Sequence, residues 1–405
     1  MKIIVIGAGL AGAAVAHALA VRGCQVTVLE AFAASSALPQ ASAAPSLGLP
    51  VALMAPHQTQ AGAAPSVISQ LSRLGLAATT LAAQTLLVQG QDWQPCGALQ
   101  RAGKLGPQAH WFGDAAWVKP AALVAAWLAH PCITLRSGMQ VHQVQSTHSA
   151  APAWQALDAH GLVLAQADAC VLANAYQAKA LLQRLQDDGA SSAAPPDAQR
   201  LVDALHQVAG QVIYGPWDAR WQALWPTLLP ELAAHRPAHG ALHASDADNF
   251  CAINGNGHFI PAVPWGNHGQ RIWLSGSTYE HGAPRQLPVM PQVTPLGITT
   301  NLQRLQQLIP AAADLLAQQH GAGELHGWAG TRCTTRARLP VVGAIEDVGT
   351  AGLFMCTAMG SRGLSFAALC AQHVASAVMH SHDSPLPSHL QNALEPRAAG
   401  RATQK

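Results

Sequence analysis

Three glycines and one glutamate near the N-terminus have the spacing of a dinucleotide-binding site. Gly7, Gly9 and Gly12 stand between a short apolar run and an alanine-rich segment, and Glu30 ends the next apolar run. The first glycine permits a tight turn, the second lets the backbone approach a pyrophosphate, and the third lets a helix pack closely on a strand. That helix directs its N-terminal N–H groups at the phosphates, and Glu30 stands where a carboxylate binds the hydroxyl groups of an adenosine ribose. We predict a dinucleotide site, with an ordinary strand–turn–helix unit as the alternative.

A second glycine turn lies near the C-terminus. The apolar run Leu353–Thr357 is followed by Gly360 and then by a segment with helical spacing. The N-terminus of that helix carries partial positive charge, which together with Arg362 would stabilise the negative charge of a reduced flavin. A tight turn in which Arg362 forms a surface ion pair fits the same residues, so both interpretations stay open at this point.

Two arginines and a tyrosine are candidates for substrate binding. A planar guanidinium binds a carboxylate through two parallel hydrogen bonds, and Arg332 and Arg336 lie in a Gly- and Thr-rich segment. We predict Arg332 as a carboxylate ligand or flavin-site residue, with Arg336 as the weaker candidate and a structural ion pair as the alternative. Tyr279, one of three tyrosines, is a candidate hydrogen-bond donor to the substrate, and a half-buried core tyrosine is the alternative.

Other reaction chemistries lack their motifs. His235, His239 and His243 have the spacing of metal ligands on a helix, but Pro237 and Gly240 oppose that helix, so we predict no metal site. The chain contains no GxSxG elbow of a serine hydrolase. It also contains no second GxGxxG turn, so we expect oxygen rather than NAD(P)H to reoxidise a flavin.

The composition bounds the partners and the compartment. The 405 residues include 22 basic and 20 acidic side chains, a net charge of +2, which is not the strongly basic footprint of a nucleic-acid-binding domain. No stretch of about 18 or more residues is continuously apolar, so we expect no transmembrane helix. Eight scattered cysteines without a CxxC pair fit a reduced compartment. We therefore expect a soluble, cytoplasmic protein without a membrane partner.

The elements that would position these residues alternate in type along the chain. We expect helices over residues 66–90, 121–129, 302–319 with a break at Pro310, and 364–379, and strands over 133–135, 139–144, 165–174, 211–214, 252–261, 271–279 and 353–357. Parallel strand–helix units at both ends, with antiparallel-looking strands between them, predict an α/β fold in which a discontinuous Rossmann-like domain carries an inserted mixed-sheet domain. The polar segment from Ser381 is expected to be extended or disordered.

Seven segments resemble, in the same order, those of one enzyme family. They are the opening glycine motif and residues 171–175, 210–212, 255–261, 276–283, 330–343 and 353–364. They are similar to the FAD-dependent oxidoreductase domain that forms the C-terminal half of the bacterial bifunctional enzyme making 5-methylaminomethyl-2-thiouridine in tRNA. That domain belongs to the D-amino-acid-oxidase and glycine-oxidase superfamily. The resemblance runs from residue 1 to about Arg397, and its most specific parts are residues 330–343 and 353–364.

The resemblance implies a D-amino-acid-oxidase-like fold, FAD as cofactor and a set of site residues. It places Gly7, Gly9, Gly12 and Glu30 on the ADP half of FAD, Ser42 and Gly48 near the flavin, Val141 at the adenine and Asn174 at the pyrophosphate. It places Arg332, Gly360, Ser361, Arg362, Gly363 and Leu364 around the isoalloxazine. The implied FAD-binding domain comprises residues 1–60, 117–205 and 326–385, the substrate domain comprises 61–116 and 206–325, and 386–405 form a C-terminal tail.

The resemblance also implies a reaction. The related domain oxidises the secondary amine of 5-carboxymethylaminomethyluridine at the tRNA wobble position, which leaves 5-aminomethyluridine and releases glyoxylate. Oxidation of a free small amino acid, such as glycine, sarcosine or a D-amino acid, is the first alternative. An FAD-binding scaffold without turnover is the second, because the region from Leu99 to Trp117 is shorter than in the family. The family's methyltransferase half has no counterpart in this sequence, so a separate methyltransferase is an expected partner.

A tRNA substrate requires local positive charge on a chain of nearly neutral net charge. Each phosphate contact releases counterions, so tRNA binding would weaken steeply with salt. The candidate cations are Arg397, Arg401 and Lys405 in the tail, together with Arg101 and Lys104.

Overall fold

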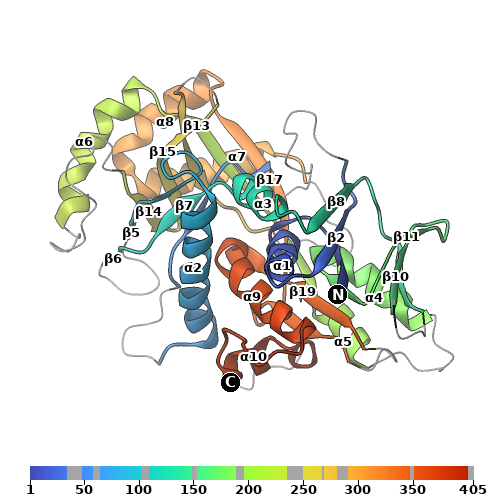
Figure 1. The fold of residues 1–405 in the computed structure, drawn as a ribbon. Coiled ribbons are helices and arrows are strands. Elements are labelled where there is room, and N and C mark those ends of the chain that lie inside the picture. The colour runs from blue at the N-terminus through green and yellow to red at the C-terminus, as the bar shows by residue number, and fades with distance from the viewer. Residues whose placement is uncertain are drawn as a thin grey trace.

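The computed structural model describes residues 1–33, 48–57, 64–101, 109–147, 151, 153–187, 196–234, 250–266, 269–280, 291–346 and 351–399. Two large sheets lie in different halves of the molecule, each with its own helices (Figure 1). No described helix is both long and apolar enough to cross a membrane.

The first sheet has six strands in the order β18-β19-β12-β1-β2-β8. Its members are β1 (Lys2–Ile6), β2 (Gln25–Glu30), β8 (Ile133–Ser137), β12 (Ala169–Leu172), β18 (Val341–Ala344) and β19 (Leu353–Thr357). All neighbouring pairs from β19 to β8 are parallel, and β18 is antiparallel to β19. Helices that cover both faces of a parallel sheet bury its strands, which explains their continuous apolar runs. This sheet confirms the predicted Rossmann-like fold.

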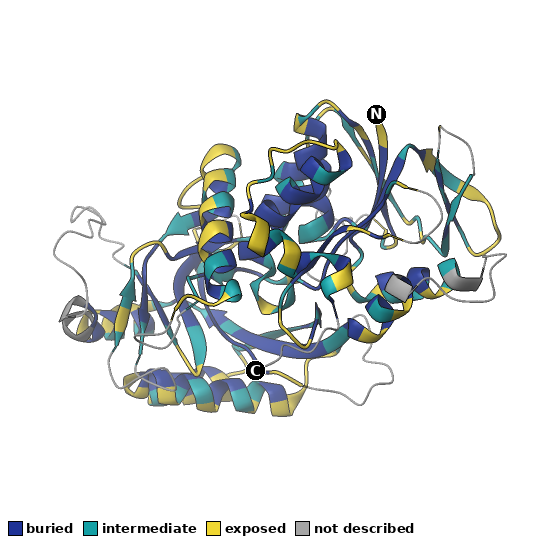
Figure 2. Cartoon of the chain, turned by 90° about the horizontal axis from the view of Figure 1, so that it is seen from below, coloured by how far each residue is buried: buried dark blue, intermediate teal, exposed yellow. Residues whose placement is uncertain are grey.

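Helices cover both faces of this sheet. On one face lie α1 (Leu10–Val21), α2 (Val67–Leu86), α3 (Pro120–Leu128) and α9 (Gly363–Val378), and on the other lie α4 (Ala178–Asp187) and α5 (Pro196–Ala204). Small residues let α2 and α9 approach closely: a Cβ at Gly75 would lie 2.0 Å from the carbonyl oxygen of Ser365. The central strands are buried, while the outer helices keep exposed faces (Figure 2). The helices predicted over 66–90, 121–129 and 364–379 are confirmed.

Four predicted strands have wrong bounds. The segment 252–261 belongs to two antiparallel strands, Ala252–Gly255 and Gly257–Pro264, and the strand predicted over 271–279 ends at Gly276. A separate antiparallel sheet contains β9 (Gln143–Ser146), β10 (Trp154–Leu157) and β11 (Val163–Ala167). The single strand predicted over 165–174 is wrong because the chain leaves this sheet at Asp168, which exchanges hydrogen bonds with the backbone of Lys2, and β12 starts at the next residue. The strand predicted over 139–144 begins only at Gln143, because the Met139 N–H donates to the carbonyl oxygen of Glu30 and holds the preceding segment as a loop.

The second large sheet has seven strands in the order β17-β13-β16-β15-β14-β5-β6. Its members are β5 (Ala98–Gln100), β6 (His110–Phe112), β13 (His206–Pro216), β14 (Ala252–Gly255), β15 (Gly257–Pro264), β16 (Arg271–Gly276) and β17 (His326–Thr334). Only β14 and β5 pair in parallel, so the sheet is mixed, as predicted.

Different layers cover the two faces of the seven-stranded sheet. One face packs on α6 (Ala219–Ala234), α7 (Pro295–Leu308), the short helix η3 (Pro310–Ala312) and α8 (Ala313–Gly321). The other faces a small sheet of β3 (Ala52–Met54), β4 (Trp93–Pro95) and β7 (Ala116–Val118). The predicted break at Pro310 is confirmed, because the proline starts η3 between the two helices.

The predicted domain boundaries stay predictions, although one strand bears on them. β17 pairs with β13 along its whole length, so it belongs to the seven-stranded sheet despite the boundary predicted at residue 326. The prediction of an extended or disordered tail is wrong over residues 386–399. That segment contains α10 (Ser388–Leu394) and η5 (Pro396–Ala398), and Leu390 and Leu394 are buried against the six-stranded sheet's helical layer.

Candidate functional site

A cleft of about 570 Å³ lies where the two large sheets approach each other. One wall consists of the loops at the carboxyl ends of β1, β12 and β19, which is where open parallel sheets bind ligands. The other wall is a face of the seven-stranded sheet, with Val212 of β13, His258 of β15, and Trp328 and Arg332 of β17. The cleft therefore joins the expected cofactor-binding loops to the expected substrate residues.

The first glycine turn has room for glycine only. Gly7 has a φ of +99°, and a Cβ there would lie 2.9 Å from the Cα of Asn174. A Cβ at Gly12 would lie 1.8 Å from the carbonyl oxygen of Gly7, so α1 could not pack on this turn with any larger residue. Gly9 is the N-cap of α1 and lines the cleft. This arrangement is the bare backbone cradle that a pyrophosphate at a helix N-terminus requires.

Glu30 is buried and organises the loops around it. One carboxylate oxygen accepts a hydrogen bond from the Ala8 N–H at 2.7 Å, and the other accepts one from the Phe32 N–H at 3.1 Å. A carboxylate offers about four acceptor positions, so two bonds leave capacity for ribose hydroxyl groups. The loop carrying Val141 is fixed nearby, because the Gly138 N–H donates to the carbonyl oxygen of Phe32. The predicted contacts of Glu30 and Val141 with FAD stay predictions.

Asn174 supplies a polar atom that has no hydrogen-bond partner among the described residues. It follows β12 and precedes the short helix η2 (Ala175–Gln177), and this atom is its buried side-chain oxygen. Buried polar atoms are rarely left unpaired. A bound molecule with hydroxyl groups, such as the ribityl chain or ribose of FAD, would satisfy this oxygen. The glycine cradle and this unpaired atom fit the cofactor.

The second glycine turn forms the opposite end of the cofactor wall. Ala358 and Gly360 both have a φ of +58°, the short helix η4 spans Gly360–Arg362, and α9 starts at Gly363. Residues Gly360, Ser361, Arg362, Gly363 and Leu364 all line the cleft. Burial lowers the pKa of the Arg362 guanidinium. The interaction with Tyr279 raises that pKa, and the charge of Arg338 lowers it further. No ion pair of Arg362 occurs among the described residues, so the surface-ion-pair interpretation gains no support there.

Arg332 lies across the floor of the cleft. Its Nη2 donates to Ser277 Oγ at 2.7 Å and its Nη1 approaches the carbonyl oxygen of Thr278 at 3.4 Å. The space for the guanidinium exists because residue 210 is glycine: a Cβ there would lie 2.1 Å from Arg332 Nη1. Burial lowers the pKa of Arg332, and within the described ranges no carboxylate forms an ion pair with it. Such a cation can bind an incoming carboxylate.

Tyr279 faces the cleft and is not a core residue. Its side chain is 53% exposed and lines the cleft. Burial alone would raise the pKa of its phenol, but a hydrogen bond with Ser361 and the charge of Arg332 outweigh this, and the pKa is lowered. The half-buried core alternative for Tyr279 is therefore wrong, while its contact with substrate stays a prediction.

His258 is a cleft residue that the sequence did not single out. Four residues form one row across the sheet: Trp328 pairs with Val212, Val212 with Gly276, and Gly276 with His258. Burial, aided by the charge of Arg332, lowers the pKa of His258 to about 4, so its imidazole is neutral near pH 7. The motif at 255–261 contains this histidine, but only the register of distant strands shows that it reaches the cleft.

Of the remaining predicted site residues, the structure describes Gly48 but not Ser42 or the three histidines. Gly48 is packed on the indole of Trp328, since a Cβ at Gly48 would lie 2.8 Å from Trp328 Nε1. Ser42 and the three histidines at 235, 239 and 243 lie outside the described residues. Within the described ranges, no group of three or more His, Cys, Asp or Glu side chains is arranged to hold a metal.

The chain belongs to the FAD-dependent oxidoreductase family, whose model matches residues 2–377. FAD is therefore the cofactor, and its binding by the cradle at Gly7–Gly12 stays a prediction. Relatives include the tRNA 5-methylaminomethyl-2-thiouridine biosynthesis bifunctional protein MnmC of a Polaromonas species, 36% identical over 97% of this chain and 59% of that protein. The protein of the same name from Albidiferax ferrireducens is 37% identical over 97% of this chain and 58% of that protein. The chain thus spans about three fifths of these relatives.

Solved structures share the fold. Glycine oxidase from Bacillus cereus superposes with a TM-score of 0.62 at 16% identity, covering 100% of this chain and 99% of that one. Fructosamine oxidase (Amadoriase II) from Aspergillus fumigatus superposes with a TM-score of 0.66 at 14% identity, covering 99% and 91%. The resemblance to the D-amino-acid-oxidase superfamily is confirmed for both family and fold.

Proposed function

We propose that the protein oxidises a secondary amine that carries a carboxymethyl group on a tRNA nucleoside. The substrate would be 5-carboxymethylaminomethyluridine at the wobble position, and the products would be 5-aminomethyluridine and glyoxylate. The observation that carries the proposal is Arg332, a partly buried guanidinium in the cleft with no described carboxylate partner and a glycine beneath it. The names of the curated relatives support tRNA as the substrate.

The side chains of the cleft would bind and orient the substrate. When bound, FAD accepts a hydride from the carbon beside a neutral amine. Arg332 would bind the carboxylate of the carboxymethyl group through two hydrogen bonds and so fix the direction of its C–H bonds. Ser277 holds the guanidinium at 2.7 Å and prevents its rotation. The neutral imidazole of His258 can accept a hydrogen bond from the amine N–H, and the Tyr279 hydroxyl can donate one to the substrate.

Positive charge in and near the cleft favours tRNA over a free amino acid: Arg338 and Arg362 line the cleft, and Lys179 and Arg336 lie near His206. We name Lys179, Arg336, Arg338 and Arg362 the cationic rim. Burial lowers the pKa of His206, and the charges of Arg336 and Lys179 lower it further. Burial likewise lowers the pKa of His57, and the charges of Arg362 and Arg338 lower it further. No ion pair of a rim residue occurs in the part of the chain that the structure describes. A chain of net charge +2 thus concentrates positive charge where a phosphodiester backbone would lie.

The cations predicted earlier for tRNA binding do not form such a cluster in the described structure. Arg397 is paired with Glu395. Arg101 lies in the loop after β5, where its backbone N–H donates to the carbonyl oxygen of Asn254. Arg401, Lys405 and Lys104 lie outside the described residues.

The proposal extends to location and the following step. A cytoplasmic location fits an enzyme that acts on tRNA. The primary amine left by the reaction would be consumed by a methyltransferase, consistent with the bifunctional description of the relatives. That activity would be supplied by another polypeptide or by another part of a longer chain.

Anaerobic flavin reduction tests the proposal. The holoenzyme is mixed with tRNA carrying the carboxymethylaminomethyl group, and flavin bleaching is compared with that produced by glycine, sarcosine and D-alanine. We expect much faster bleaching by the tRNA and recovery of glyoxylate in equal amount. Fast bleaching by a free amino acid, with none by the modified tRNA, would show a small-molecule oxidase. No bleaching by any amine would show an FAD-binding scaffold.

A further inference from the structure

An aromatic cluster continues the cleft floor along the same face of the seven-stranded sheet. Tyr214 follows Val212 by two residues on β13, and His326 precedes Trp328 by two residues on β17. Because strand side chains alternate between faces, Tyr214 and His326 lie on the same face as these cleft residues. They also pair with each other in the sheet register. The next row of the floor beyond the cleft therefore contains two rings.

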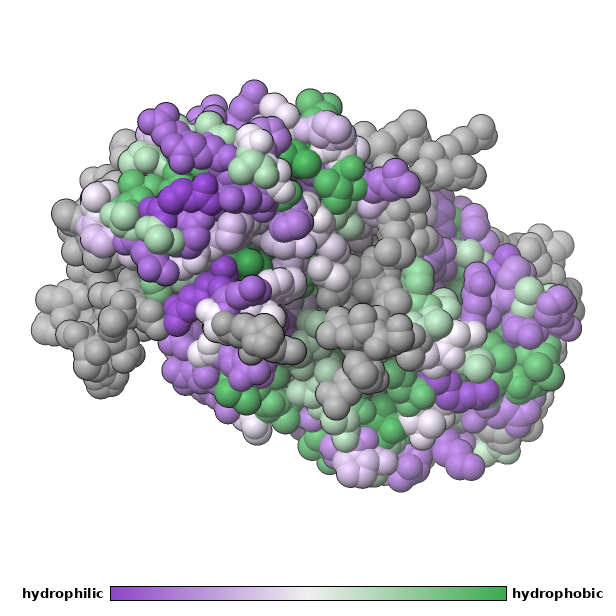
Figure 3. Space-filling model, turned by 90° about the horizontal axis from the view of Figure 1, so that it is seen from above, coloured by the Kyte–Doolittle hydropathy of each residue, from purple (hydrophilic) through white to green (hydrophobic). Residues whose placement is uncertain are grey.

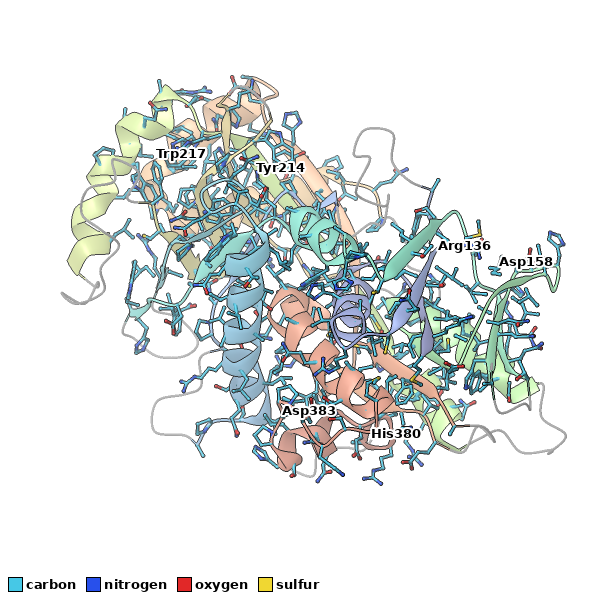
Figure 4. All side chains as sticks on the ribbon, viewed as in Figure 1. Arg136, Asp158, Tyr214, Trp217, His380 and Asp383 are labelled. Carbon is cyan, nitrogen blue, oxygen red and sulfur yellow. The ribbon has the colours of Figure 1, made fainter. Side chains whose placement is uncertain are left out.

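Trp265 extends this row outward. It follows β15 in the turn to β16, and its backbone N–H donates to the carbonyl oxygen of Gln270 at 2.8 Å. The centroid of its ring lies 6.0 Å from that of Tyr214, and the imidazole of His326 lies 5.5 Å from Tyr214 on the other side. We name Tyr214, Trp265 and His326 the aromatic shelf. Figure 4 labels Tyr214 in the half of the molecule that contains the seven-stranded sheet.

The exposure of the shelf is unusual for this chain. Aromatic residues make up 5% of the sequence. Among the described residues, the exposed phenylalanine, tryptophan and tyrosine side chains are Tyr279, inside the cleft, and Trp265, at 37% exposure on the shelf. Hydrophilic and hydrophobic residues are interspersed over the face of the molecule seen from above (Figure 3). The two exposed rings are thus Tyr279 in the cleft and Trp265 on the shelf that continues the cleft floor.

We propose that the aromatic shelf stacks unpaired nucleobases next to the nucleoside held in the cleft. Two residues along a strand span about 7 Å, so the row of Tyr214 and His326 lies one short step beyond the cleft row of Val212 and Trp328. A base has two apolar faces, so stacking on tryptophan or tyrosine tolerates different sequences. The shelf provides apolar area on which bases can stack, and the cationic rim provides positive charge for the RNA backbone. This inference rests on the proposed tRNA substrate and adds the surface that recognises its neighbouring bases.

Binding of a labelled anticodon stem-loop RNA, followed by fluorescence anisotropy with the FAD-loaded enzyme, tests the shelf. We expect Trp265→Ala to weaken binding about 5- to 10-fold, the lower part of the range for loss of one base stack, and Trp265→Phe to retain most of the affinity. The slope of log Kd against log salt should stay that of the wild type, because Trp265 contacts no phosphate. By contrast, Arg336→Gln should lower that slope.

The outcomes separate the shelf from the proposed function. Equal affinity of Trp265→Ala and wild type, or equal losses in Trp265→Ala and Trp265→Phe, would overturn the shelf while tRNA-dependent flavin bleaching by the wild type stands. Absence of that bleaching in the wild type would overturn the proposed function itself. FAD content and unfolding temperature check the fold of each variant. If Trp265→Ala is destabilised, His326→Ala replaces it as the test variant. The exposed ring of His326 should also contribute to RNA affinity, so unchanged RNA binding by His326→Ala would overturn the proposed shelf.

Discussion

The guanidinium of Arg332 lies over the ring of Tyr279, with 4.8 Å between the guanidinium carbon and the ring centroid. A cation over an aromatic face is attracted by the ring quadrupole. The contact therefore helps to hold Arg332 in place, together with the hydrogen bond to Ser277. Arg332 lines the cleft, where a carboxylate could bind.

Arg332→Lys tests the carboxylate contact. Lysine keeps the charge but cannot form two parallel hydrogen bonds, and one lost charged hydrogen bond costs about 1.5–3 kcal/mol. We expect flavin reduction by a carboxylate-bearing amine to slow about 10- to 100-fold, with FAD content unchanged. Stopped-flow absorbance measures the rate. A Lys variant that reduces at the wild-type rate would show that Arg332 does not bind the carboxylate.

Gly210→Ala perturbs the same arginine without changing it. The new Cβ would lie 2.1 Å from Arg332 Nη1, so the guanidinium must move. We expect the rate to fall as in Arg332→Lys. Gly321→Ala is the matched control, because a Cβ there meets nothing within 4 Å. Similar rates in the two glycine variants would contradict the proposed clearance.

Glu30→Ala separates cofactor binding from loop structure. We expect FAD affinity to fall by about 1.5–3 kcal/mol, because the carboxylate should bind the adenosine ribose. The variant also loses the acceptors for the Ala8 and Phe32 N–H groups, so the apoprotein should lose thermal stability as well. Comparing unfolding temperatures with and without FAD resolves the two effects. An apoprotein loss with unchanged FAD affinity would leave Glu30 with a purely structural role.

The cofactor half of the site could be predicted from sequence because its signals are local. The requirement for glycine at positions 7 and 12 is visible in the motif itself, because the φ of Gly7 is +99° and a Cβ at Gly12 would meet the carbonyl oxygen of Gly7. The substrate half depends on register between strands far apart in the chain. His258 reaches the cleft because β15, β16, β13 and β17 align it with Trp328, which no local pattern encodes. The same reasoning explains Asp168, whose bond to Lys2 ends a strand that looked continuous.

The pH dependence of flavin reduction should report Tyr279. Its lowered pKa means that the phenol loses its proton below the ordinary tyrosine range, near pH 10. As pH rises through that lowered value, the hydroxyl stops donating a hydrogen bond to substrate, so the rate should fall on the alkaline side. Tyr279→Phe should be slower at neutral pH and lack this alkaline limb. An identical alkaline limb in the Phe variant would assign it to another group.

The last prediction concerns the cationic rim and uses an unusual backbone position. Arg338 has a φ of +58°, where a side chain is strained and glycine is not. Arg338→Gly therefore removes the cation while suiting the turn, which the Arg338 N–H closes on the carbonyl oxygen of Thr335 at 3.0 Å. We expect an unfolding temperature no lower than that of the wild type. The slope of log Kd for modified tRNA against log salt should become shallower by about 0.7–0.9, the contribution of one phosphate contact. Arg397→Gln is the control, because that arginine already pairs with Glu395 and its loss should leave the slope unchanged. If Arg338→Gly keeps the wild-type slope, the cation at residue 338 binds no phosphate.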